Sequence, residues 1–415
     1  MVAERLDVAF VPAECPGSEG SGATHSSTVY IEQLSRHHDL TVYVSTQMDA
    51  ADATLPASDR VEYVLHDGLP KLPHPIFTKM DALREEHDAL ESHDLVHSYS
   101  SAFIPVLDDL SVPTLVTLNS YLPVCPKADL LYHGERKCSG PGLLKCAGCV
   151  PATALKRRQG IEAELRQGYV SAGQIPFVRR SIRRADGITA YHALSPHLRE
   201  DYADIGFPKE AITVIPHFYD DHFYRSSATV DEPAEPFSLL YVGALQDIKG
   251  VDTLVRALAL LEQAGHQVEL RIAGRGPYEQ TLRSLATELD VAESVTWYGY
   301  VDHDELPDLY ADSDAFVYPG VIDEPFGRVM LEALASHTPI LSSDVGSMDY
   351  IVGPAGALFE PGNERSLVRA FETLRENYVD HQQAISHQLE RFSSERVIDA
   401  LSSLYADTAL SNHAV

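Results

Sequence analysis

The stretch GVIDEPFGRVMLEALA, Gly320–Ala335, places two carboxylates in an apolar part of the chain. From Phe326 onward the pattern predicts a helix that is apolar on nearly every side, and such a helix is expected to be buried. Glu332 nevertheless lies inside this helix, and Glu324 lies in the kinked loop before it. Because a buried carboxylate without partners is costly, each must accept hydrogen bonds. For Glu332 two interpretations stay open: a partner within the fold, or a ligand with paired hydroxyls such as a ribose.

Around this stretch, short apolar runs alternate with helical periodicity almost from end to end, which is typical of parallel α/β layers. The first strand is expected at Leu6–Pro12, and the alternation restarts at 238–244. The sequence therefore predicts two Rossmann-like, doubly wound domains, at 1–216 and 237–387, joined by a linker at 217–236. Sheets of this kind bind ligands at the carboxyl ends of their strands, so two facing domains predict a cleft between them.

Composition excludes several classes of protein. A chain of 415 residues is expected to form two or three domains. Its 32 Lys and Arg residues against 61 Asp and Glu residues give a net charge of −29, so a nucleic-acid partner is not expected. The acidic excess is typical of adaptation to high salt, where self-repulsion is screened. Without a long apolar run or a signal peptide, we expect a cytoplasmic protein.

Three strand-to-helix junctions of the second half are candidate anion sites. After Gly243, a loop leads to Lys249, which lies one residue before a predicted helix, and an ammonium beside a helix N-terminus is suited to phosphate. The next junction, RIAGRGPYEQ, places Arg275 between two glycines. At the third, Phe326–Arg328 would supply backbone N–H donors of a first helical turn. A solvent-facing lysine and a structural Gly-x-Gly turn are the alternatives.

The second half strongly resembles the retaining glycosyltransferases of family 4, which have the GT-B fold. The resemblance is carried by the E-x7-E pair, Glu324 and Glu332, within EPFGRVMLEALASHTPILSSDVGS, and by YVGALQDIKGVDTLVRALALL, LRIAGRGPYEQTLRSL and GALFEPGN. The first half matches more loosely. The resemblance implies an α/β chain whose two domains face each other across a cleft, with a final helix, about 388–415, packed back on the first domain.

The resemblance also implies roles for individual residues. Lys249 would hold the diphosphate of a nucleotide-sugar donor, Glu324 would touch the donor sugar, and Glu332 would bind the nucleotide ribose. Lys249 and Glu324 are therefore the catalytic candidates. The other donor-side candidates are Gly243, Arg275, Tyr300, Val301, Phe326, Gly327, Arg328 and Val329. The acceptor-side candidates are Gly20, Gly22, His97 and Asn119. For His97, a core or capping histidine is an equal alternative.

The function that follows is a retaining glycosyltransferase that moves a sugar from a nucleoside-diphosphate sugar to an acceptor hydroxyl, without a metal at the reaction centre. The acceptor is expected to be a glycan or a lipid-linked sugar, with at most peripheral membrane contact. Ala244, Asn119 and His217 depart from the usual family residues. These departures keep two alternatives open: a catalytically weak sugar-nucleotide-binding protein, and another GT-B enzyme such as a sugar-nucleotide epimerase.

A cysteine-rich insert interrupts the first domain at 121–150. It contains Cys125, Cys138, Cys146 and Cys149, spaced C-x12-C-x7-C-x2-C. The final C-x2-C is the usual knuckle of a tetrahedral metal site, so a structural zinc is expected. An iron–sulfur cluster, two disulfides and unlinked thiols are the alternatives. We expect the insert to act as a clip that shapes access of the acceptor.

Overall fold

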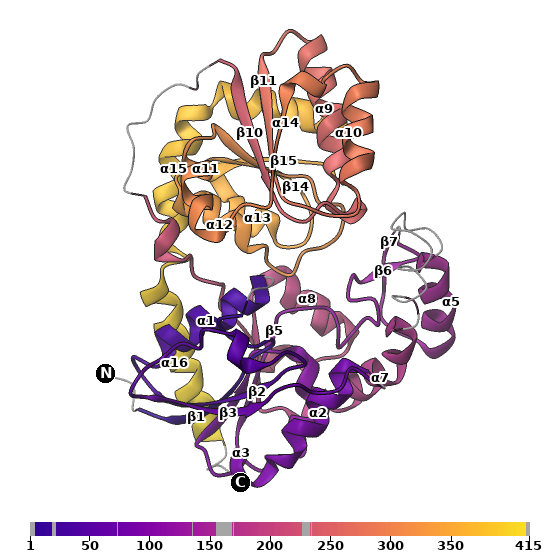
Figure 1. The fold of residues 1–415 in the computed structure, drawn as a ribbon. Coiled ribbons are helices and arrows are strands. Elements are labelled where there is room, and N and C mark those ends of the chain that lie inside the picture. Colours follow the sequence, from indigo (N-terminus) through magenta and orange to yellow (C-terminus); the bar gives the residue numbers. More distant parts are fainter. Residues whose placement is uncertain are drawn as a thin grey trace. The chain divides into compact units, whose positions relative to one another are not determined.

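The computed structural model describes residues 5–18, 22–72, 74–134, 136–154, 168, 170–225, 233 and 235–411. The chain divides into two compact units (Figure 1). Of the described residues, those up to 154, those from 168 to 216 and those from 395 to 411 form unit 1, and those from 217 to 394 form unit 2.

Unit 1 is built on a parallel sheet. In its described part, seven strands run in the order β3-β2-β1-β4-β5-β8-β9, and every neighbouring pair is parallel. The strands are β1 (Asp7–Val11), β2 (Asp39–Ser45), β3 (Val61–His66), β4 (Leu95–Ser98), β5 (Thr114–Leu118), β8 (Ala190–Ala193) and β9 (Ile212–Val214). The helices are α1 (Gly22–Leu34), α2 (Pro75–Glu85), α3 (His87–Leu90), α4 (Ile104–Leu107), α5 (Leu143–Ala154), α7 (Ile175–Arg183), α8 (Pro196–Ile205) and α16 (Ser394–Leu410). A small hairpin pairs β6 (Leu131–Tyr132) with β7 (Arg136–Lys137).

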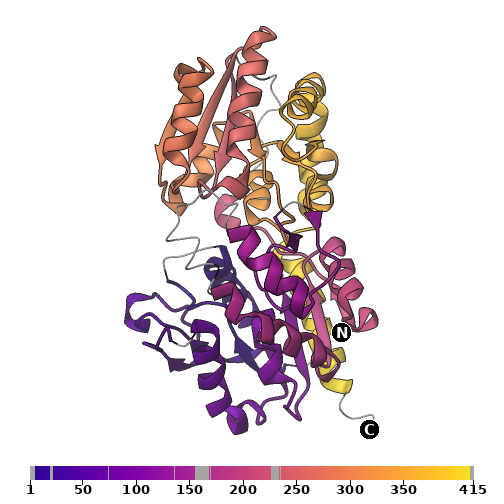
Figure 2. The same cartoon turned by 90° about the vertical axis from the view of Figure 1, so that its right-hand side faces the viewer.

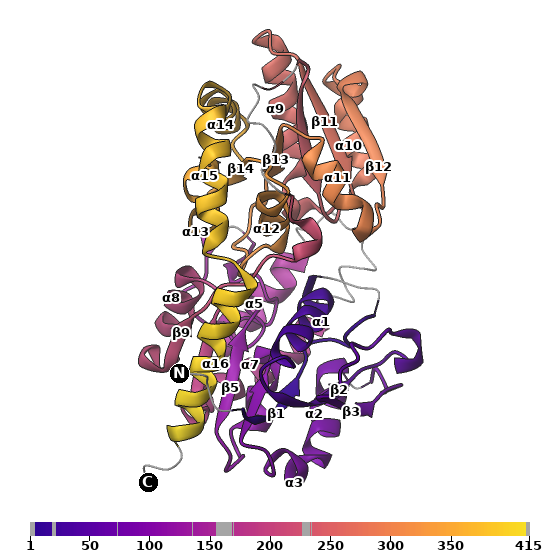
Figure 3. The same cartoon turned by 90° about the vertical axis from the view of Figure 1, so that its left-hand side faces the viewer.

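Helix α16 lies along unit 1, although it is the last helix of the chain (Figure 3). A buried polar network joins it to the sheet. The Tyr405 hydroxyl lies 2.6 Å from Nδ1 of His97, whose Nε2 lies 2.8 Å from the Thr117 hydroxyl. That hydroxyl lies 3.0 Å from His192 Nδ1, and Nε2 of His192 donates to a backbone carbonyl at 2.7 Å. Because each of these buried groups has a partner, the network costs little and fixes α16 on the sheet.

Unit 2 is a second parallel sheet. In its described part, six strands run in the order β12-β11-β10-β13-β14-β15. They are β10 (Phe237–Val242), β11 (Val268–Ala273), β12 (Val295–Gly299), β13 (Ala315–Tyr318), β14 (Ile340–Ser343) and β15 (Gly356–Phe359). The helices are α9 (Val251–Gln263), α10 (Glu279–Glu288), α11 (Leu306–Ala311), α12 (Arg328–Ala335), α13 (Met348–Val352), α14 (Glu364–Glu376) and α15 (Tyr378–Glu390).

Helices cover both faces of the unit 2 sheet (Figure 2). Helix α9 contacts α10 and α14 in one layer, and α12 contacts α11, α13 and α15 in the other. The main core lies under the first layer, where Leu239 and Tyr241 of β10 pack with Leu258 of α9 and Phe371 of α14. Each such fully buried side chain contributes about 1.5–3 kcal/mol. The packed sheet is therefore a rigid platform for the loops at its carboxyl edge.

The predicted architecture of two Rossmann-like α/β halves is confirmed, with differences in detail. The helix expected from Phe326 begins at Arg328, because Gly327 before it has a left-handed φ of 86°. The helix expected from about 388 begins at Ser394, since α15 continues to Glu390. The described first part of the expected linker, 217–225, belongs to unit 2, where a short 3-10 turn contacts α12.

No helix among the described residues is long and apolar enough to cross a membrane.

The buried histidines of unit 1 make a pH dependence predictable. Burial lowers the pKa of His192 and of His38 to about 4, and it holds the pKa of His97 well below 6.5. Below pH 6.5, these histidines therefore bind protons in the unfolded chain but stay neutral in the folded chain until the pH is much lower. Stability is fully present above pH 6.5, the ordinary histidine pKa, and is lost as the pH falls.

We expect the free energy of unfolding of unit 1 to fall by about 1.4 kcal/mol for each fully buried histidine when the pH is lowered from 7.5 to 5.5. The melting temperature should fall with it. Calorimetry at several pH values in this range measures the slope of the unfolding free energy against pH. In His192→Gln the slope should be smaller, whatever the variant does to stability at pH 7.5. An unchanged slope would contradict the assignment of this pH dependence to His192.

Candidate anion-binding site

The strand order of unit 2 defines where a ligand can bind. Strands β10 and β13 are neighbours, but the chain continues from β10 toward one edge of the sheet and from β13 toward the other. The loops that leave these two strands therefore separate and open a crevice at the carboxyl edge. Lys249 lies in the loop after β10, and Glu324 lies in the loop after β13. The fold thus brings together the two residues expected to be catalytic.

Lys249 and Glu324 form an ion pair at this edge. The Lys249 Nζ lies 3.0 Å from Glu324 Oε2, and both side chains are about a quarter exposed, at 24% and 26%. The Tyr318 hydroxyl at the end of β13 donates to the same carboxylate oxygen at 2.7 Å. Burial, and then the Glu324 charge, raise the Tyr318 pKa well above its usual value, so this hydroxyl stays protonated and remains a donor. Tyr318 and Lys249 therefore hold the Glu324 carboxylate, which is still a quarter exposed.

Two glycines allow the loops of this pair to meet. Gly250, which caps α9, has a φ of 67°, and a Cβ there would lie 2.0 Å from the Pro319 carbonyl oxygen. The Val321 N–H donates to the Ile248 carbonyl across the same contact at 3.2 Å. Any side chain at Gly250 would push the two loops apart. Gly250 therefore sets the separation of Lys249 from the loop that follows β13.

Arg328 is the first residue of α12, and its side chain indicates a site for an anionic ligand. Its Nε and Nη1 atoms are buried and have no hydrogen-bond partner among the described residues. A guanidinium remains charged, so two buried N–H groups without acceptors are costly. Helix α12 itself has no side-chain cap at its N-terminus, where Gly327 precedes it. Arg328 and the first amides of α12 together provide donors for an anion.

Glu332 is held from within the fold. The Tyr310 hydroxyl of α11 donates to Glu332 Oε2 at 3.0 Å, and burial followed by the Glu332 charge raises the Tyr310 pKa well above its usual value. The structure thus supplies the fold partner for Glu332 and leaves the ligand interpretation open.

A third loop supports the one that contains Glu324. It follows β14, and sequence reasoning missed it. The Ser343 hydroxyl donates to the Gly320 carbonyl at 2.6 Å, the Gly346 N–H donates to Asp323 at 3.1 Å, and the Ser347 hydroxyl donates to the Pro325 carbonyl at 2.8 Å. The available signal was the run SSDVGS directly after a predicted strand, which is typical of a turn rich in side-chain hydrogen bonds.

The other donor-side candidates occupy the neighbouring strand ends. Gly243 follows β10, and its N–H donates to the carbonyl that ends β11 at 3.0 Å. Arg275 is exposed, and its backbone carbonyl accepts from the next loop at 3.0 Å. Tyr300 and Val301 follow β12, and Tyr300 is 64% exposed. Phe326 is buried and packs edge-on against the His217 ring, and Val329 is in the first turn of α12. These residues share one edge of the sheet.

The acceptor-side candidates belong to unit 1 and differ in exposure. His97 is 0% exposed and is fully engaged in the α16 network, so its core interpretation is the one the structure supports. Asn119 is half-buried, where its amide donates to the Tyr99 carbonyl at 3.0 Å. Gly22 is the first residue of α1, and Gly20 lies outside the described residues.

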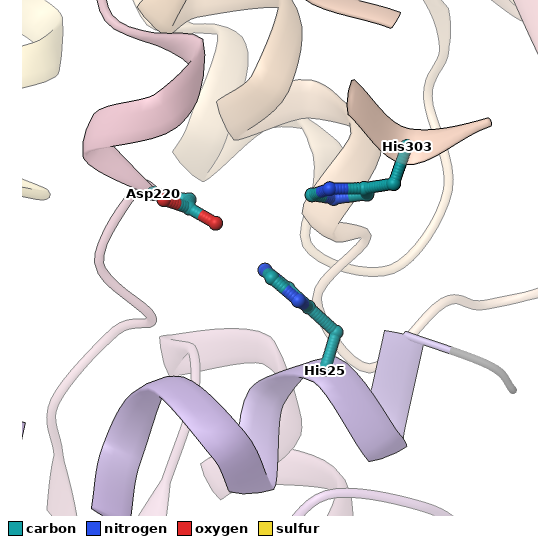
Figure 4. A group of neighbouring side chains, drawn as sticks. All are labelled: His25, Asp220 and His303. Atoms are coloured by element: carbon teal, nitrogen blue, oxygen red, sulfur yellow. The ribbon is translucent and has the colours of Figure 1, made fainter. Parts of the chain in front are cut away.

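A further polar group in unit 2 contains His222, His303 and Asp304. The two imidazoles stack with centroids 6.0 Å apart, and His222 Nε2 lies 3.7 Å from the Asp304 carboxylate. Figure 4 shows His303 beside Asp220 of the same unit, with their polar atoms within 4.8 Å. Because His222 and Asp304 are exposed, this group is an ordinary surface cluster and does not define a site.

Comparison with solved structures identifies the class of fold. The chain superposes on sucrose-phosphate synthase from Thermosynechococcus elongatus with a TM-score of 0.68 at 18% identity, covering 97% of this chain and 99% of that one. It superposes on Anabaena HepE, solved with UDP-glucose, with a TM-score of 0.67 at 17% identity, covering 97% and 100%. The fold is therefore GT-B, as the sequence predicted.

Sequence comparison adds a family match to part of the chain. Residues 225–391 match the profile of the family Glycosyl transferases group 1. A glycosyltransferase of Methanocaldococcus jannaschii, described as uncharacterized, is 39% identical over 132 residues, which are 32% of each chain. A GDP-mannose-dependent phosphatidylinositol monomannoside mannosyltransferase of Mycobacterium tuberculosis is 30% identical over 233 residues, which are 52% of this chain and 60% of that one. The matches thus span a third to three fifths of these relatives.

The geometry predicts that unit 2 binds pyrophosphate through Lys249 and Arg328. We expect Lys249→Ala and Arg328→Ala each to weaken pyrophosphate binding about tenfold or more, because each removes a charge-assisted donor worth about 1.5–3 kcal/mol. Titration calorimetry measures the dissociation constants. Lys209→Ala is the matched control, since Lys209 also pairs with a glutamate but lies in unit 1. Equal affinity in all three variants and the parent protein would refute the site.

Proposed function

We propose that this chain is a retaining glycosyltransferase of the family 4 type, which transfers a sugar from a nucleoside-diphosphate sugar to an acceptor hydroxyl. The observation that carries the proposal is the Lys249–Glu324 pair at the switch point of a GT-B sheet. Arg328, four residues after Glu324, adds two buried nitrogens that have no hydrogen-bond partner among the described residues. The family match over 225–391 supports the same reading.

The proposed chemistry places the diphosphate against the cations. The acceptor oxygen attacks the anomeric carbon, the bond from that carbon to the phosphate oxygen breaks, and the hydroxyl proton passes to the departing phosphate. Negative charge grows on the diphosphate as it leaves. Lys249, Arg328 and the N-terminal amides of α12 would stabilise that charge. Attack from the side of departure gives retention, so we assign no protein nucleophile and no metal to the reaction centre.

The ion pair gives Glu324 a second role in this proposal. In the free protein, Lys249 is the partner of Glu324, and Tyr318 holds the same oxygen. A bound diphosphate would compete for the lysine. The carboxylate, still oriented by Tyr318, would then accept from hydroxyls of the donor sugar. Preorganisation of this kind costs little at the moment of reaction.

For the acceptor and the donor, we propose the chemical class. A glycan or lipid-linked sugar is the proposed acceptor class, and the mycobacterial relative, whose described acceptor is a phosphatidylinositol mannoside, is in keeping with it. A thermal-shift panel of UDP- and GDP-sugars would identify the donor base. Binding in this panel without transfer to any acceptor and without donor hydrolysis would favour the alternative of a sugar-nucleotide-binding protein, which Ala244 keeps open.

The direct test of the proposed function is transfer by Glu324→Gln. This variant keeps the size of the side chain but removes its charge, and we expect the rate of transfer or donor hydrolysis to fall about 100-fold or more while pyrophosphate binding persists. Glu200→Gln is the matched control, because Glu200 also pairs with a lysine, in unit 1. Full activity in Glu324→Gln would overturn the proposal.

The proposed ribose contact of Glu332 has its own test. Glu332→Ala should weaken binding of a nucleoside diphosphate about tenfold, through loss of hydrogen bonds to a charged acceptor, and leave inorganic pyrophosphate binding unchanged. The comparison is made by calorimetry with both ligands on both proteins. If both affinities fell equally, Glu332 would act only through the fold, and the ribose assignment would be wrong.

A further inference from the structure

The four cysteines of the insert converge on one cavity in unit 1. The cavity has a volume of about 10 Å³, which is enough for a single small atom or ion. All four cysteines line it: Cys125, Cys138, Cys146 and Cys149. Three of them are buried, Cys138 is half-buried, and none is in a disulfide. The fifth cysteine, Cys15, lies in another part of the unit and does not line this cavity.

The cysteines reach the cavity from three separate segments. Cys125 lies in a turn after β5, and Cys138 directly follows β7 of the small hairpin. Cys146 and Cys149 lie three residues apart in α5, which places them on one face of the helix. A spacing of C-x2-C on a helix opposite two cysteines from loops is the arrangement of a tetrahedral metal site.

The segment between these cysteines has little regular secondary structure before α5. Its hairpin consists of two strands of two residues, which is far below the size that is stable in water. Three non-glycine residues within it adopt a left-handed φ: Ala128 at 58°, Leu130 at 50° and His133 at 56°. Such backbone is strained and persists only where its surroundings fix it. A small element of this kind usually needs a covalent or metal staple.

The polar groups around the cavity suit a thiolate cluster. The His133 N–H donates to the sulfur of Cys149 at 3.1 Å, and such a donor stabilises a thiolate. Lys127 and Lys145 also line the cavity, in a chain with a net charge of −29. Four thiolates around a divalent cation have a charge of −2, and Lys145 can offset part of it, since Lys127 is already paired with Asp129. Asp129 is already held by Lys127 and by a backbone N–H, so the cysteines are the better ligands.

We propose that Cys125, Cys138, Cys146 and Cys149 bind one Zn²⁺ that staples the insert of unit 1. Among the described residues, no three of these sulfurs lie within 4.8 Å of one another. Binding would therefore draw the sulfurs inward to about 2.3 Å from the metal, with loss of the thiol protons. The site is a closed set of four protein ligands, so its role is structural and it takes no part in transfer.

Metal analysis of the full-length protein tests the proposal. We expect about one zinc per chain after purification without added metal, and a loss of most of it in the double variant Cys146→Ser/Cys149→Ser. Cys15→Ser is the matched control, because it removes a buried cysteine outside the cavity and should leave the zinc content unchanged. Substitution with Co²⁺ should give the absorption bands of a tetrahedral cobalt thiolate.

A second readout keeps the test meaningful if the double variant folds poorly. Removing zinc from the parent protein with a strong chelator should raise hydrogen exchange in 125–149, and added Zn²⁺ should restore protection. Pyrophosphate binding by unit 2 should persist throughout. A protein purified without metal, with four thiols that react freely or with two disulfides, would overturn the proposal. Stoichiometric iron in place of zinc would also overturn it.

Discussion

The reversal of strand order between β10 and β13 is the constraint on which the site depends. It separates the two loops that leave these strands, while Gly250 lets them touch at their base, where a Cβ would collide with the Pro319 carbonyl. Lys249 and Glu324 are 75 residues apart in sequence but 3.0 Å apart in space for this reason alone. The loop after β14 then supports the loop that contains Glu324, through serine hydroxyls and the Gly346 amide. The sheet topology thus determines where Lys249 and Glu324 lie, and the loop contacts fix their positions more closely.

Both glutamates of the E-x7-E pair are held in the fold by the same kind of contact. Each takes one hydrogen bond from a buried tyrosine, Tyr318 for Glu324 and Tyr310 for Glu332. Burial and the adjacent carboxylate raise both tyrosine pKa values, so each hydroxyl is a permanent donor. A phenol stabilises the charge without neutralising it, whereas a close arginine would bind the carboxylate on both oxygens. The two tyrosines therefore orient both carboxylates from within the fold.

The sequence predicted much of the fold, because apolar runs and glycine-bearing loops report directly on strands and strand ends. It predicted Lys249 and Glu324 at neighbouring strand ends for the same reason, whereas only the family resemblance joined Glu332 to them. It missed Tyr310, because only the contact between α11 and α12 brings that hydroxyl near Glu332. It placed the start of α12 two residues early, since the left-handed φ of Gly327 is invisible in an apolar pattern. For His97 the sequence offered a core histidine as one alternative but could not reveal its partner, because Tyr405 is 308 residues away on the last helix.

The net charge of −29 gives these local arrangements their importance. At range, the acidic surface repels any phosphate-bearing ligand, but that repulsion is screened beyond about 8 Å at physiological salt and over shorter distances at high salt. Contacts at hydrogen-bond distance and partly buried are screened far less. Lys249, Arg328 and the amides of α12 can therefore outweigh the distant acids, and more so as the ionic strength rises. Ala244 supplies no charge after β10, and in the proposed function a diphosphate would instead meet the buried nitrogens of Arg328, which have no acceptor among the described residues. An acidic protein can bind an anion only where its few cations are concentrated and their donors are left unsatisfied.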